Sequence, residues 1–229
     1  MKQTFQKTVN LLTCLFITTL FIQSLFTVQG QEGQIELDAS QEAMIQEAYL
    51  KTLEEVYDES IKSLISSNYP ASFNYALYDI DENGIPELII AENDSARQIY
   101  TYDLEEATVV LLEEVETPFT ERSQLLITKD SLIHQQLSGG ATLTKYDTYR
   151  IAEDGISLEQ VGDYLFDADS HPSAPFVIDG DTSTTYTEDE FDQLVEGQWY
   201  NGSSSDPAEI EFIEIDNLFT DNPFHLDEN

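Results

Sequence analysis

Apolar residues recur at helical spacing in the first acidic stretch of the chain. Between residues 38 and 68 they form one face of a helix, and most acidic residues lie on the other face. The apolar positions are Ile45, Tyr49, Leu53, Val56, Tyr57, Ile61, Leu64 and Ile65. Asp38 or Ser40 supplies a suitable N-cap, and the helix should end by Asn68, before Pro70. The pattern predicts an amphipathic helix that covers a sheet.

Short apolar runs separated by turn residues follow this helix and indicate β-strands. We expect two groups of four strands, with a break between the groups near Pro118. The first group spans residues 73–78, 87–91, 97–102 and 108–114, and the second spans 124–128, 131–136, 142–151 and 156–166. Lys129 with Asp130, and Asp154 with Gly155, are expected to form two-residue turns.

This order of elements predicts an α+β fold. We expect the N-terminal amphipathic helix to pack on a curved antiparallel β-sheet, a meander of about eight strands. Closure into a propeller is not expected, because a propeller needs at least about four blades and the chain has length for two.

The C-terminal third is richer in turn residues, and residues 168–185 are expected to form a loop. Thr187 and Glu190 match a capping box, which predicts a short C-terminal helix through Val195. Residues 210–212 alternate as a strand would, although Asp206 and Pro207 could equally begin a helix.

The N-terminal 30 residues have the pattern of a secretory leader. A short basic start is followed by an apolar run over residues 9–28, and the small residue Gly30 suits cleavage. We expect residues 1–30 to be a signal peptide, 31–37 a flexible lead-in, 38–219 a single globular domain and 220–229 a tail. The alternative is an uncleaved membrane anchor, since about twenty apolar residues can span a bilayer. The sole cysteine, Cys14, lies in the leader, so no disulfide is expected in the exported chain.

The remaining sequence is strongly acidic. The chain has 9 basic and 45 acidic residues, a formal net charge of −36. Such a surface repels nucleic acids and anionic lipids, so we exclude nucleic acid as a partner and expect membrane contact only through an uncleaved leader. Self-repulsion also destabilises the compact state, an effect that bound cations would relieve.

An acidic loop lies between the first two predicted strands and suggests a specific cation site. Its sequence, DIDENGIPEL over residues 79–88, places candidate side-chain oxygens at positions one, three, five and nine and a glycine at the sixth. The candidate ligands are Asp79, Asp81, Asn83, Glu87 and the backbone carbonyl of Ile85. Ca²⁺ suits such a loop because it accepts six to eight oxygen ligands in flexible geometry. An acidic β-turn without an ion remains the alternative.

The loop resembles the D-x-D-x-[DN]-G-x-x-[DE]-L calcium loops of FG-GAP repeats, and the wider segment is similar to one found in secreted proteins of Gram-positive bacteria. An EF-hand fits less well, because the twelfth loop position is Ile90 instead of glutamate and the flanks favour strands over helices. The resemblance covers about twenty residues. It implies a structural Ca²⁺ and an extracellular location.

No recognised catalytic motif accompanies this loop. The chain has no Gly-x-Ser-x-Gly elbow, no His-Glu-x-x-His and no phosphate-binding glycine loop, and its three histidines match no ligand spacing. Asp163, Asp167 and Asp169 with His171 could hold a second cation, but a solvated loop is the favoured interpretation. We expect a secreted, non-catalytic calcium-binding module that binds a protein or glycan outside the cell. The alternatives are an extracellular hydrolase that uses dispersed carboxylates, and an accessory or inhibitory domain of another secreted protein.

Overall fold

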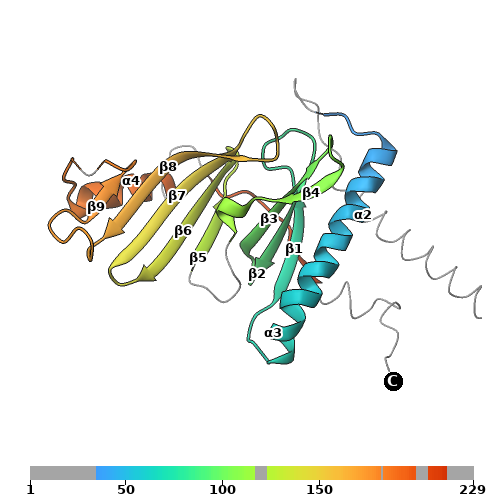
Figure 1. Cartoon of the computed structure of the whole chain (residues 1–229), viewed down its shortest axis with the longest axis horizontal. Helices are drawn as coiled ribbons and strands as arrows, with labels where there is room; N and C mark the ends of the chain where they lie inside the picture. The colour runs from blue at the N-terminus through green and yellow to red at the C-terminus, as the bar shows by residue number, and fades with distance from the viewer. Residues whose placement is uncertain (1–34, 117–122, 182, 200–205, 216–229) are drawn as a thin grey trace, which may run out of the picture.

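The computed structural model of the chain describes residues 35–116, 123–181, 183–199 and 206–215 (Figure 1). The predicted leader and C-terminal tail lie outside these ranges. None of the helices within them combines the length and apolar character that crossing a bilayer requires.

The predicted N-terminal helix is confirmed. Helix α2 spans Ala39–Val56, continues through a π-helical turn η1 at Tyr57–Ile61, and ends with α3 at Lys62–Ser66. Asp38 is the N-cap and forms a reciprocal capping box with Gln41. The buried residues of this helix are Ile45, Tyr49, Leu53, Tyr57 and Ile61, all from the predicted apolar face.

The strands form one open antiparallel sheet. They are β1 Phe73–Tyr78, β2 Glu87–Glu92, β3 Ser95–Asp103, β4 Thr108–Leu111, β5 Ser123–Ile127, β6 Leu132–Gly140, β7 Leu143–Ile151, β8 Leu158–Asp167, β9 Phe176–Ile178 and β10 Ile213–Glu214. The order is β10-β1-β2-β3-β5-β6-β7-β8-β9, with β4 also paired to β3. The α+β fold with an antiparallel sheet is therefore confirmed, and each of the eight predicted strands has a counterpart. Within the described ranges the sheet nevertheless has ten strands and is not the simple meander expected, because β5 pairs with β3 instead of β4.

Several boundaries differ from the prediction. The fourth strand ends at Leu111 and is followed by a 3-10 turn, η2 at Glu113–Val115. The turn between β7 and β8 covers residues 152–157, so Asp154 and Gly155 lie within a longer turn than expected. The predicted loop 168–185 contains the short strand β9, which pairs with the end of β8. The strand expected at 210–212 lies slightly later, at β10.

Strand β3 divides the sheet into two halves. The second part of β3 pairs with β4, whereas Ala96 near its start pairs with Leu125 of β5. We call α2 to β4, with β10, the first half, and β5 to β9, with the short helix α4 at Glu188–Trp199, the second half. Figure 1 shows α2 at one end of the sheet and α4 at the other.

Three hydrophobic clusters stabilise this arrangement. One lies under α2, and a small one lies under α4, where Phe191 and Val195 contact Tyr164. The third joins the halves, because it combines Ile89 and Ile99 of the first half with residues such as Ile133 of the second. This shared core places the β1–β2 loop near strands and turns that are distant in sequence.

Candidate metal centre

The acidic loop connects β1 to β2. The two strands pair antiparallel, with Tyr78 opposite Glu87, so residues 79–86 must reverse the chain within one tight loop. Two left-handed residues make this possible, Glu82 with φ +60° and Gly84 with φ +96°. The predicted strand flanks on both sides of the loop are thus confirmed.

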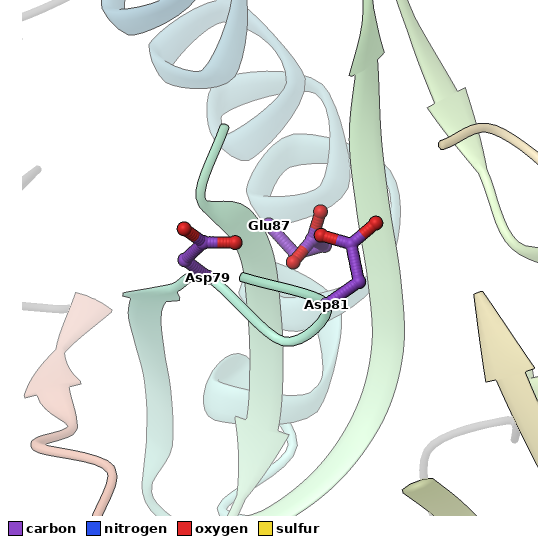
Figure 2. Close-up of side chains that lie close together, drawn as sticks. All are labelled: Asp79, Asp81 and Glu87. Carbon is purple, nitrogen blue, oxygen red and sulfur yellow. The ribbon is translucent and has the colours of Figure 1, made fainter. Parts of the chain in front are cut away.

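Three of the five predicted ligands converge. Oxygen atoms of Asp79, Asp81 and Glu87 all lie within 4.8 Å of one another, and Figure 2 shows the three carboxylates gathered at the loop. Glu87, the first residue of β2, is completely buried, and the two aspartates are partly exposed. The local fold therefore brings three acidic groups close together. At such short range, a proton or a cation is needed to neutralise their negative charge.

Loop amides fix one oxygen of each carboxylate. Gly84 N–H donates to Asp79 Oδ2 at 2.9 Å, and Ile80 N–H donates to Glu87 Oε2 at 2.8 Å. Asn83 N–H donates to Asp81 Oδ1 at 3.2 Å. The second oxygen of Asp79, Oδ1, is buried and accepts no hydrogen bond from any residue that the structure describes. An oriented, buried oxygen without a donor is what a cation ligand requires.

Asn83 holds the turn through its side chain. Its Nδ2 donates to Asp81 Oδ2 at 2.9 Å, and its Oδ1 accepts from Ile85 N–H at 2.7 Å. Asn83 and Ile85 thus belong to the loop as predicted, but the side-chain amide of Asn83 is already engaged. An oxygen has two lone pairs, so Asn83 Oδ1 retains one with which it can ligate an ion.

Burial raises the pKa of all three acidic groups. It raises the pKa of Asp79 to about 6, against the effect of the Gly84 amide. Burial likewise raises the pKa of Asp81. The pKa of Glu87 is raised well above its ordinary value, first by burial and then by the nearby charges of Asp81 and Asp79. Burial raises these pKa values because it disfavours the ionised carboxylates, and a bound cation would oppose the shifts by stabilising the ionised forms.

In the part of the chain that the structure describes, no basic side chain neutralises these carboxylates. The ion pairs formed among the described residues do not include any of the three carboxylates. The donor set consists entirely of oxygen atoms, which suits a hard divalent cation such as Ca²⁺ or Mg²⁺ and disfavours softer metals. The residues present therefore fit the ion that the sequence predicts.

Residues from outside the loop support it. Tyr49 of α2 donates its hydroxyl to the Pro86 carbonyl at 2.9 Å, and Ile35 N–H donates to the Asn83 carbonyl at 2.6 Å. Thr101 of β3 lies with its Oγ1 at 3.4 Å from Glu87 Oε1. Sequence analysis does not find these residues, because each lies at least 14 positions from the nearest proposed ligand and matches no spacing.

The second acidic group considered from sequence does not assemble. Asp167 Oδ1 accepts the backbone N–H groups of Asp169 and Ser170, and Asp169 Oδ2 accepts the Thr142 hydroxyl. Asp163 Oδ1 forms an ion pair with Lys145 Nζ at 4.0 Å. Within the described ranges, only the Asp79, Asp81 and Glu87 group has the proximity of a metal-ligand set.

No protein-family model, curated protein sequence or solved structure matches this chain. The resemblance of residues 79–88 to FG-GAP calcium loops therefore remains a prediction carried by the loop residues themselves. The candidate centre is assigned from its own geometry and chemistry.

Proposed function

We propose that this chain is a secreted, non-catalytic domain that binds Ca²⁺ in its β1–β2 loop and presents a surface for a protein or glycan outside the cell. The observation that carries the proposal is the convergence of three carboxylate groups with the buried Asp79 Oδ1, which has no hydrogen-bond donor in the described residues. The leader-like N-terminus and the acidic composition favour an exterior location, where calcium is abundant.

The ion has a structural role in this proposal. Asp79, Asp81 and Glu87 would supply carboxylate oxygens, with Asn83 Oδ1 and the Ile85 carbonyl as further ligands. Ca²⁺ is preferred over Mg²⁺ because a loop of mixed carboxylate, amide and carbonyl oxygens gives an irregular shell, which Ca²⁺ tolerates and Mg²⁺ does not. By neutralising the carboxylates, the ion would offset both the cost of their burial, which is the main cause of their raised pKa values, and their mutual repulsion.

Thermal unfolding with calcium and with chelator tests the proposal. Calcium sites of extracellular modules often have dissociation constants of about 10⁻⁴ to 10⁻³ M. Calcium well above that concentration should stabilise the protein by about 1–3 kcal/mol. Asp81→Ala should remove most of this response, because it deletes one ligand carboxylate. The matched control is Asp181→Ala, which removes a partly exposed turn aspartate remote in sequence from the loop.

Two results would contradict calcium binding. One is an equal stabilisation of the wild-type protein and Asp81→Ala. The other is a magnesium response as large as the calcium response, since general screening of the acidic surface does not distinguish the two ions.

A further inference from the structure

The turn between β7 and β8, residues 152–157, lies against the loop proposed to bind calcium. Thr101 of β3 donates its hydroxyl to the Gly155 carbonyl at 3.0 Å, and the same oxygen lies 3.4 Å from Glu87 Oε1. A methyl group placed on Gly155 would lie 3.4 Å from Asn83 Nδ2. The turn therefore approaches two of the proposed ligand residues, although it belongs to the second half of the sheet.

This turn is ordered by its own hydrogen bonds. Gly155 N–H donates to the Ala152 carbonyl, and Ala152 N–H donates to the Ser157 carbonyl, both at 2.9 Å. The Asp154 side chain accepts from Ile156 N–H and Ser157 N–H. Because these hydrogen bonds connect the residues of the turn, a change in the hydrogen bond to one of its carbonyls affects the whole turn.

Thr101 is the link between the turn and the ion site. Its side chain is buried, with 1% of the residue exposed, so its hydroxyl has little access to water as an alternative partner. A hydroxyl carries a single hydrogen, which it can donate fully either to Gly155 or to Glu87. When Glu87 ligates a cation, its oxygens are weaker acceptors, and the hydrogen remains with the Gly155 carbonyl.

Asn83 forms a second link between the ion site and the β7–β8 turn. Its side chain forms the turn bonds to Asp81 and Ile85 described above. Coordination would restrict the position of this side chain further, and Gly155 lies directly beside its amide group. The ion would thus fix both loop residues that the turn faces.

We propose that cation binding in the β1–β2 loop locks the β7–β8 turn through Thr101, so that the ion couples the two halves of the sheet. This inference rests on the proposed function, because it requires the loop to bind the ion. It predicts an effect of calcium at residues 152–157, which contain none of the proposed ligands.

Hydrogen exchange of the purified protein, with Ca²⁺ or with chelator, tests the coupling. Binding should slow exchange of the Gly155, Ile156 and Ser157 amides by about tenfold, because local opening must then break the Thr101 link. The β5–β6 turn, residues 128–131, is the internal control and should be unchanged. Calorimetric titration in the same buffers shows separately whether the ion binds.

Substitutions at Thr101 identify the link. Thr101→Val removes the hydroxyl at nearly constant volume and should abolish the calcium-dependent slowing at residues 155–157, while Gly84 and Ile85 amides still respond. Thr101→Ser keeps the hydroxyl and should preserve the slowing. Thr128→Val is the matched control, since it removes a buried hydroxyl that bonds the Leu132 carbonyl in the β5–β6 turn.

The two proposals fail in distinguishable ways. If titration shows Ca²⁺ binding and the wild-type turn exchanges equally fast with and without the ion, the coupling is wrong and calcium binding stands. If titration shows no binding, both proposals are wrong. Both outcomes are measured on the wild-type protein, with Ca²⁺ and with chelator, so they can be distinguished even if Thr101→Val does not fold.

Discussion

Two acidic turns of this protein have similar compositions and opposite properties. In the β1–β2 loop, burial raises the pKa values of Asp79 and Asp81. At the end of β8, where the second turn begins, Asp167 is partly exposed, and hydrogen bonds from Ser170 lower its pKa. The carboxylates of the first turn gather at Glu87, which is completely buried, whereas Asp169 and Ser170 of the second turn are exposed to water.

The difference shows how the proposed cation site differs from an ordinary acidic surface. Asp167 directs its oxygen to amides of its own turn, so its charge is already compensated. The β1–β2 loop uses its amides in the same way, but it adds a buried glutamate and leaves Asp79 Oδ1 without a donor in the described part of the chain. In a chain with 45 acidic residues, some carboxylates lie close together by chance, so proximity alone carries little information. Burial of a carboxylate is the more informative feature.

The largest expected effect follows removal of the buried glutamate. Glu87→Ala should destabilise the protein by about 3 kcal/mol, because it leaves a cavity and deprives Ile80 N–H of its acceptor. Urea denaturation measures this change, with exposed Glu105→Ala as the control. Glu87→Gln retains volume and an acceptor, so it should keep most of the chelator-state stability and lose the calcium response. A small loss of stability in Glu87→Ala would contradict the idea that buried Glu87 supports the loop.

Substitution of the loop glycine should have the next largest effect. Gly84 has φ +96°, and a Cβ atom there would lie 2.4 Å from the Ile35 carbonyl oxygen. Gly84→Ala should therefore cost about 2 kcal/mol or more in unfolding free energy. The control, Gly180→Ala, has a similar positive φ of +70° and nothing within 4 Å, so it should cost only about 1 kcal/mol. Equal losses would show that residue 35 does not contact the loop in solution.

With chelator present, the pH dependence of stability should reveal the raised pKa of Asp79. Folding raises the pKa of Asp79 to about 6, so the folded state binds the proton more tightly than the unfolded state. The stability from Asp79 is complete below about pH 4 and is lost as the pH rises through about 6. Because the group is partly exposed, we expect about 1 kcal/mol. The difference between wild type and Asp79→Asn isolates this effect from general acidic repulsion.

Calcium should reduce this pH dependence, because the ion replaces the proton that the folded loop otherwise retains. Urea denaturation at about pH 4 and about pH 7, with calcium and with chelator, measures the change. If wild type and Asp79→Asn lose stability equally over this range in chelator, Asp79 does not titrate as its environment indicates.

The smallest effect is expected in the exposed turn. Asp167→Asn keeps an oxygen that can accept the Asp169 and Ser170 amides, so melting with and without calcium should be almost unchanged. A reduced calcium response in this variant would instead indicate a second ion site after β8.

Much of the fold was accessible from local patterns. The 3.6-residue period identified the buried face of α2, because residues such as Ile45, Tyr49 and Leu53 must share one side of a helix. Alternating and apolar runs located eight strands, and antiparallel order followed from the short connections. The strands β9 and β10 were less accessible, because two or three residues carry almost no periodic signal.

The sequence by itself determined the identity of the loop carboxylates, since their spacing and the glycine at position 84 are local features. Only the tertiary structure decided that Glu87 is buried, that Asp79 keeps an oriented oxygen, and that Thr101 joins the loop to the β7–β8 turn. Burial and long-range hydrogen bonds depend on how the sheet curves and which segments cover it. No spacing of residues within one short segment records that information.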